Sequence, residues 1–217
     1  MLAARHGHTQ SSRAALEVLC RLYWKPLYIY VRARGGPPEH AQDIVQSFFE
    51  HVLEQEVLDH ADPARGKFRS FLLASLRNFM ADQWDKDRAR KRGGDATHIQ
   101  FDTAGANLPA PGMSPDAAFE RQWALSVIEH GWALVGEAMV AEGNAPLFDQ
   151  LHGNLTGESA APYAEIAQRL GMDEGAVRVA AHRLKKRFAK TLRQVIAQTI
   201  DDGQDIEEEL RGLLAAL

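Results

Sequence analysis

Cysteine is almost absent from this chain, and so are long apolar runs. Its 217 residues include a single cysteine, Cys20, which can form no internal disulfide and no cysteine-based zinc site. No apolar run reaches the roughly 18 residues that a membrane-spanning helix needs, and residues 1–9 lack the apolar stretch of a secretion signal. We therefore expect a cytoplasmic protein without membrane association.

Signatures of catalysis are also missing from the sequence. The nine histidines show no metal-ligand spacing, and neither a GxGxxG fingerprint nor a phosphate-binding loop occurs. No pair of carboxylates stands apart from the ordinary charges of helix surfaces. The sequence thus predicts a protein that is not an enzyme and that needs no cofactor and no metal.

Strand-like alternation is nearly absent, whereas helical periodicity covers most of the chain. Glycine, proline and capping residues separate the helical repeats. Residues 93–113 show neither period, and we interpret them as a flexible linker. The sequence predicts an all-α fold of two small helical domains, with helices over 13–31, 39–54, 67–90, 114–142, 144–155, 163–170 and from 174 to beyond 188.

The net charge of −4 argues against DNA binding until it is divided along the chain. Residues 62–92 hold nine basic and four acidic residues, a net charge of +5, and residues 175–200 hold seven basic residues and no acid, a net charge of +7. Residues 201–217 hold six acids and one arginine, a net charge of −5. The total therefore hides two basic blocks that can attract phosphate.

The most informative stretch is residues 163–188, YAEIAQRLGMDEGAVRVAAHRLKKRF. A first helix meets a turn at Gly171, where glycine supplies the positive φ of a tight turn, and Asp173 is well placed to cap a second helix. Small Ala167 lets the two helices approach, and Val177 holds the second against the first. Because the outward face is cationic, this pattern favours a DNA-binding helix-turn-helix over a solvated helical hairpin.

This stretch resembles the second DNA-binding domain of bacterial extracytoplasmic-function sigma factors, in which an EIA..LG..EGAV....HR pattern reads the minus-thirty-five promoter element. In the N-terminal half, AQDIVQSFFEHVL resembles the polymerase-binding helix of the first sigma domain, and RGKFRSFLLASLRNFMADQWDKDRARKRGG resembles the helix that melts and reads the minus-ten element. The resemblance implies a sigma factor, monomeric when free, that binds core RNA polymerase and promoter DNA. It implies a first domain over 1–92, the linker over 93–113, a second domain over 114–200 and an acidic C-terminal helix over 201–217.

The resemblance also assigns residues to two DNA sites. Single bases outside the duplex need aromatic or apolar pockets beside cations, although a phenylalanine in such a helix is more often core than stacking platform. For the minus-ten site we expect Arg65, Lys67, Phe68, Arg69, Asn78, Trp84, Lys86, Arg88, Arg90 and Lys91. For the minus-thirty-five site we expect Glu174, Gly175, Arg178, Val179, His182, Arg183, Lys185 and Lys186, with Arg178 and His182 reading bases.

One departure from the family pattern lies inside the second site. Val179 and Ala180 stand where many members of the family carry a polar residue and an arginine. This change puts one base or phosphate contact, and with it the promoter preference, in doubt. The two apolar side chains are suited instead to contact with thymine methyl groups.

The expected polymerase-binding face comprises Asp43, Gln46, Ser47 and Glu50. Relatives often carry an acid where this chain has Ser47, and a subgroup that it resembles is switched on by Ser/Thr kinases. One hypothesis is therefore that phosphorylation of Ser47 adds the missing charge. The alternative is that Ser47 is a small polar residue on a helix that binds without modification. An anti-sigma factor is the other regulator that the family suggests.

The acidic tail carries Ile206, Leu210, Leu213 and Leu214 at helical spacing. We expect a short amphipathic helix, which either folds back on the basic helix over 175–200 and suppresses DNA binding or is a solvated terminal helix. Two other functions stay open. The main one is a stand-alone helix-turn-helix repressor that binds a palindrome as a dimer, and the weaker one is a decoy that has kept the fold and lost initiation.

Overall fold

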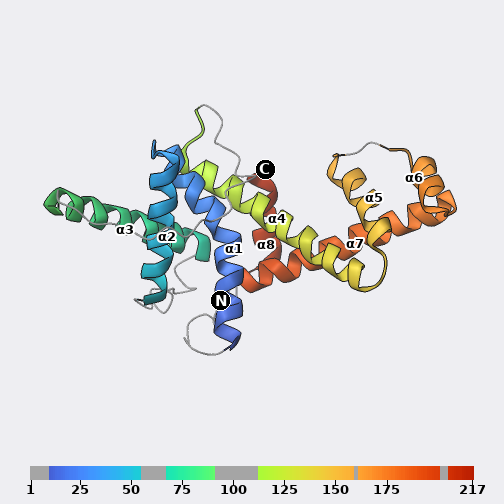
Figure 1. Cartoon of the computed structure of the whole chain (residues 1–217), viewed down its shortest axis with the longest axis horizontal. Helices are drawn as coiled ribbons and strands as arrows, with labels where there is room; N and C mark the ends of the chain where they lie inside the picture. Colours follow the sequence, from blue (N-terminus) through green and yellow to red (C-terminus); the bar gives the residue numbers. More distant parts are fainter. Residues whose placement is uncertain (1–9, 55–66, 91–111, 159–160, 201–204) are drawn as a thin grey trace. The chain divides into compact units, whose positions relative to one another are not determined.

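The computed structural model describes residues 10–54, 67–90, 112–158, 161–200 and 205–217, with side chains from Glu17 to Gln83 and again from Gly112 onward. This part of the chain is helical and contains no strand, so the predicted all-α class is confirmed (Figure 1). The helices are α1 (Gln10–Ala33), α2 (Pro38–Glu54), α3 (Phe68–Arg90), α4 (Pro115–Ala141), α5 (Ala145–Thr156), α6 (Tyr163–Leu170), α7 (Glu174–Thr199) and α8 (Ile206–Ala215).

The helix bounds follow the local signals in the sequence. Ser114 Oγ accepts a hydrogen bond from the backbone N–H of Ala117 at 3.2 Å, which caps α4 with Pro115 in its first position. Pro26 lies inside α1 without ending the helix. Most of the predicted linker, 93–113, lies outside the described residues. No helix among those described is both long enough and apolar enough to cross a membrane.

The chain divides into two compact units. Unit 1 comprises residues 1–126 and 196–217, and unit 2 comprises residues 127–195. The domains over 1–92 and 114–200 were expected from function, and they remain predictions. The compact units divide the chain elsewhere, because the first part of α4 and the C-terminal segment group with the N-terminal helices.

The core of unit 1 is rich in aromatic side chains from its first three helices. Phe48 of α2 is fully buried and its ring centroid lies 5.7 Å from that of Phe79 of α3. Trp24 of α1 stacks on Phe49 of α2 at 5.9 Å. The buried stripe of α2 contains Ile44, Phe48 and Val52 at helical spacing, as its sequence predicts.

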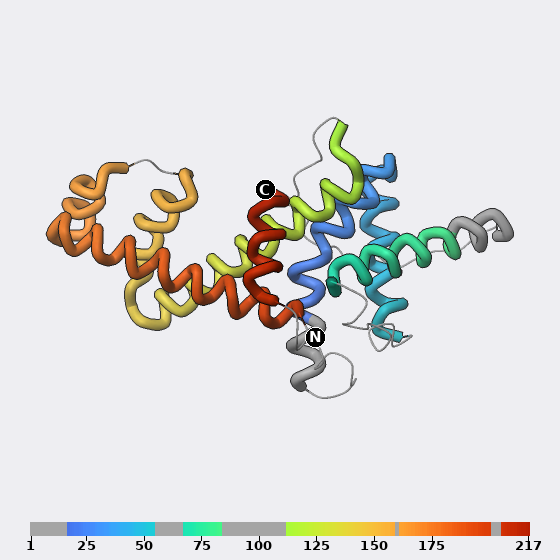
Figure 2. Tube along the Cα trace, turned by 180° about the vertical axis from the view of Figure 1, so that it is seen from behind, coloured from blue at the N-terminus to red at the C-terminus, as the bar shows by residue number. Residues whose placement is uncertain are grey.

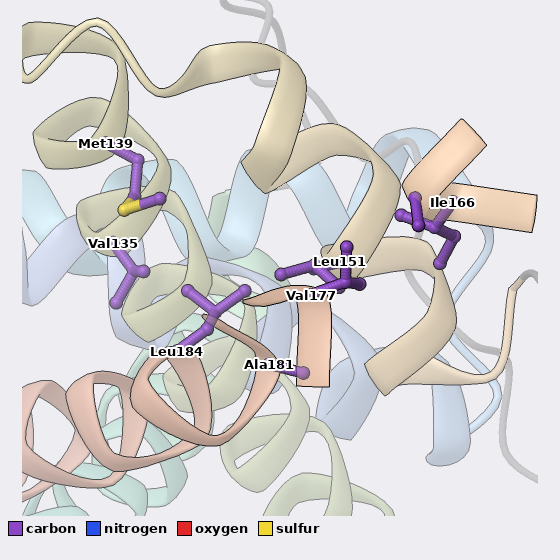
Figure 3. Packing of buried hydrophobic residues seen from close by; sticks show 8 residues of the cluster. Val135, Met139, Leu151, Ile166, Val177, Ala181 and Leu184 are labelled. Carbon is purple, nitrogen blue, oxygen red and sulfur yellow. The ribbon is translucent and has the colours of Figure 1, made fainter. Parts of the chain in front are cut away.

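The core of unit 2 joins α4, α5, α6 and α7. Its buried side chains are Val135, Met139, Leu151, Ile166, Ala167, Val177, Ala181 and Leu184 (Figure 3). Beside it the rings of Trp132 and Phe188 stack with centroids 4.0 Å apart. This packing fixes which face of α7 is buried and therefore which face is exposed.

Candidate nucleic-acid interface

The connection between α6 and α7 has the local geometry that its sequence predicts. Gly171 adopts φ 62°, a left-handed conformation that disfavours side chains, and the N–H of Met172 donates to the carbonyl of Ala167 at 2.9 Å. The Asp173 carboxylate then accepts hydrogen bonds from the N–H groups of Gly175, at 2.8 Å, and Ala176, at 3.3 Å. This cap starts α7 at Glu174.

The two faces of α7 differ completely in burial. Val177, Ala181 and Leu184 are at most 3% exposed. The opposite face carries the residues predicted for the minus-thirty-five site, and all of them are exposed apart from half-buried Glu174: Gly175, Arg178, Val179, His182, Arg183, Lys185 and Lys186. The packing of unit 2 thus presents a cationic helix face to solvent.

Arg178 contacts two side chains inside the protein, Glu174 and Tyr163. Its Nε lies 3.1 Å from a carboxylate oxygen of Glu174, and its guanidinium carbon lies 5.5 Å from the centroid of the Tyr163 ring. The same carboxylate oxygen accepts a second hydrogen bond from Nη2. These contacts hold the guanidinium near the first turn of α7, and a DNA base would have to compete with Glu174 for it.

Arg187, which belongs to the basic block, is paired in a way that the sequence did not reveal. Its Nη1 and Nη2 donate to the two carboxylate oxygens of Glu142 at 2.8 and 2.6 Å. These hydrogen bonds lower the pKa of Glu142 and raise the pKa of Arg187. Arg187 therefore contributes less to the free positive charge of α7 than its neighbours do.

A groove beside α7 was not foreseen from the sequence. It has a volume of about 560 Å³ and is lined by residues from α4, α5, α7 and the turn before α7, including Met139, Leu147, Met172, Val179 and Arg183. Val179 is 50% exposed and Met172 is 36% exposed. The outward position of Val179 follows from the helical period of α7, but the residues of α4 and α5 that complete the groove are brought there by tertiary structure.

The start of α3 differs from what the minus-ten assignment expects. Phe68 is 7% exposed and makes an edge contact with Tyr23, its ring centroid 5.6 Å away, so it belongs to the core. Arg69 is 5% exposed and forms ion pairs with Glu120 and Glu209. Neither side chain faces solvent in this arrangement, because both contribute to the packing of unit 1.

The remaining residues predicted for the minus-ten site divide into two groups. Lys67 is partly exposed and donates to Glu209 at 3.0 Å, and Asn78 is exposed on α3. Arg65 and Lys91 lie outside the described residues. The side chains of Trp84, Lys86, Arg88 and Arg90 also lie outside the described part, although their backbone continues α3.

The predicted polymerase-binding residues all lie on α2. Ser47 and Glu50 are exposed, whereas Asp43 and Gln46 are half-buried. The side-chain amide of Gln46 donates to Glu50 at 3.1 Å. These residues occupy turns of α2 between the buried positions Ile44, Phe48 and Val52.

Two arginines of α3 are held by acids of α4, a pairing that sequence reasoning missed. Arg77 donates to the hydroxyl of Tyr30 at 3.0 Å and pairs with Asp116, and these hydrogen bonds raise its pKa. Arg69 Nε donates to Glu120 at 2.7 Å. Asp116 and Glu120 are four residues apart on one helix face, which is the only signal that the sequence offers.

No protein-family model, curated protein or solved structure matches this chain. Within the described ranges, no three histidine, cysteine or acidic side chains lie together as metal ligands would. The candidate interface is therefore defined by its geometry and charge: an exposed cationic face on α7 in unit 2, and a second group of cations at the start of α3 in unit 1.

Proposed function

We propose that this chain is a sigma factor, which binds core RNA polymerase and directs it to promoter DNA. The observation that carries the proposal is the exposed cationic face of α7, which follows the glycine turn and the Asp173 cap. A helix of this kind fits the major groove, where side chains near its N-terminus contact base edges. The resemblance of both halves of the sequence to sigma factors supports the same function.

In this proposal different residues on the exposed face of α7 contact the bases and the phosphates of the DNA. Arg178 and His182 contact base edges, and exposed Arg183, Lys185 and Lys186 contact phosphates. Arginine gives bidentate contacts to guanine, whereas lysine on phosphate adds affinity without sequence information. Exposed Val179 lies between these residues on the helix and is suited to a thymine methyl group.

The polymerase contact is proposed for the exposed residues of α2. Ser47 and Glu50 lie on its solvent face, one helical turn apart. A phosphate on Ser47 would add a charge of about −1.5 to −2 to this face, which favours pairing with arginine on the polymerase. Comparing polymerase affinity of Ser47→Glu with Ser47→Ala tests this switch. Equal affinity would show that charge at this position has no role.

The deciding experiment is in vitro transcription with core polymerase, the full chain and a pool of genomic fragments. The chain should associate with the polymerase as a monomer and give defined start sites. The double variant Arg183→Ala and Lys186→Ala should lose transcription and keep polymerase binding. Arg169→Ala, which removes an exposed cation from α6, is the matched control and should behave as the parent chain.

Two outcomes would contradict the proposal. Failure to associate with core polymerase, with and without prior treatment by a Ser/Thr kinase, would remove the sigma-factor function. Tight binding of palindromic duplex DNA by a dimer, without polymerase, would favour the repressor. The alanine variants would lose duplex binding in that case too, so the polymerase measurement separates the two functions.

A further inference from the structure

A buried ionic cluster joins the C-terminal helix to the start of α3 in unit 1. Arg69 pairs with Glu209 of α8 through Nη1 and with Glu120 of α4 through Nε, at 2.7 Å. Lys67 Nζ donates to the other carboxylate oxygen of Glu209 at 3.0 Å. Both cations predicted to contact the promoter at this point thus share one carboxylate, which lies about 140 residues further along the chain.

The centre of the cluster is enclosed, whereas the side chains of Lys67 and Glu120 at its edge are 33% and 34% exposed. The side chain of Glu209 is 6% exposed and that of Arg69 is 5% exposed. The guanidinium carbon of Arg69 lies 4.2 Å from the centroid of the Trp123 ring, which is itself buried. Burial alone would lower the pKa of Arg69, but the hydrogen bonds and charges of Glu209 and Glu120 raise it. The buried cation of Arg69 is therefore compensated by the two acids around it.

The sequence of α8 is suited to this position. Glu209 and Leu213 are four residues apart, so they share one helix face, and Leu213 is fully buried. Asp205 caps the helix by accepting a hydrogen bond from the N–H of Glu207 at 2.9 Å. Figure 1 and Figure 2 show α8 in dark red beside the other helices of unit 1.

The backbone of α8 lies close to the cations of Lys67 and Arg69 at Gly212, which has no side chain. A Cβ at this position would lie 3.3 Å from Arg69 Nη2 and 3.4 Å from Lys67 Nζ. Glycine in a helix interior lowers helix stability relative to alanine, so a packing reason for it is expected. Here the missing side chain leaves room for the cations, and the turn above it supplies Glu209.

The geometry points to an intramolecular competition: Lys67 and Arg69, whose guanidinium packs on the ring of Trp123, form an anion-binding site that Glu209 of α8 occupies, and phosphates of single-stranded DNA bind there when α8 leaves. This inference rests on the proposed function, which gives the start of α3 to the promoter. Carboxylate and phosphate both accept the paired N–H groups of a guanidinium, so one can replace the other. The ion pairs of Glu209 join α8 to Lys67 and Arg69. The suggestion that the acidic tail folds back on the basic helix over 175–200 stays a hypothesis.

Two variants release α8 by opposite charge changes in the full chain. Glu209→Gln removes the carboxylate, and Leu213→Asp places a charge at a fully buried position. Glu208→Gln is the matched control, because it removes the same charge from the same helix at an exposed position 4.0 Å from Lys67. Hydrogen exchange over residues 206–215 reports whether α8 is released.

The probe is a fluorescent single-stranded DNA of about 12 nucleotides. Its fluorescence anisotropy is measured as protein is added, which gives the binding affinity. Both releasing variants should bind it at least about tenfold more tightly than the parent chain, the ratio expected if α8 is docked in about 90% of molecules or more. Glu208→Gln should change affinity by less than about twofold. Because Leu213→Asp adds negative charge, its tighter binding could not result from net charge.

The competition between DNA and α8 can also be tested without mutation, because each must weaken the binding of the other. If DNA and α8 compete, saturating the parent chain with the DNA must speed hydrogen exchange over 206–215. Equal affinities in all variants, with α8 released, would overturn the competition and leave DNA binding at other residues intact. Absence of binding in every variant would overturn both the competition and the promoter role of α3, while α7 and the polymerase contact are tested separately by transcription.

Discussion

Two groups of arginine and lysine in this protein look alike in sequence and differ in structure. On α7, Arg178, Arg183 and Lys186 are exposed, and the acid that pairs with Arg178 is Glu174 of the same helix. At the start of α3, Lys67 and Arg69 are held by acids of α4 and α8. The difference teaches that a basic block indicates a phosphate site only where distant acids leave it accessible.

The two groups of cations differ because their ion pairs are exposed to solvent to different degrees. A pair such as Arg178 and Glu174 is solvated on both sides, so water and salt reduce what it contributes. The pair of Arg69 and Glu209 is nearly enclosed, so loss of one partner leaves the other buried and uncompensated. The first group is therefore accessible from solvent, whereas the second is occupied by acids of the same chain.

The largest expected effect comes from replacing one arginine in each group. Arg69→Ala should lower the free energy of unfolding by about 4 kcal/mol, because Glu209 and Glu120 lose their buried cation. Arg183→Ala should change it by less than about 0.5 kcal/mol, as for most exposed residues. Urea unfolding followed by circular dichroism measures both. Similar losses in the two variants would mean that the groups do not differ in burial as described.

The two faces of α7 give a second contrast. Leu184 is 3% exposed, and Leu184→Ala should destabilise the protein by about 3 kcal/mol through lost burial and a cavity. Val179 is 50% exposed, and Val179→Ala should cost less than about 0.5 kcal/mol. Thermal unfolding distinguishes them. A large loss for Val179→Ala would place the solvent face of α7 elsewhere.

A third contrast compares the aspartates that cap α7 and α8. Asp173→Ala and Asp205→Ala should each cost about 1 kcal/mol, the usual effect of losing a side-chain cap. The losses should be local. Hydrogen exchange should rise at the start of α7 in the first variant and over α8 in the second. Asparagine at either position should restore most of the protection, since it is an equally good capping residue.

Local signals account for what the sequence predicts well. The bounds of α6, the turn at Gly171 and the cap at Asp173 depend on residues within a few positions of one another, so they can be read along the chain. The burial of Val177 and Leu184 follows from helical period in the same way. The exposed face of α7 was thus predictable.

Contacts between distant segments account for what the sequence does not predict. Nothing near Arg69 indicates that Glu120 and Glu209 will surround it, and Gly212 is unremarkable until its neighbours are known. The spacing of α8 also suggested that Leu214 faces the core with Leu213. Leu214 is 66% exposed, because packing selects one narrow face of the helix. Such choices depend on tertiary structure rather than on period.

The smallest expected effect concerns the exposed pair of Arg187 and Glu142. Because the pKa of Glu142 is lowered in the folded protein, the pair stabilises the fold above the ordinary carboxyl pKa, and this contribution is lost as the pH falls through the lowered value. Glu142→Gln should therefore unfold at a slightly lower temperature than the parent chain at pH 7 and at the same temperature at pH 2. Added salt at pH 7 should also reduce the difference, since exposed charges are screened. A difference that survives both acid and salt would show that Glu142 acts through packing and not through its charge, and the contrast between exposed and enclosed ion pairs would fail at this position.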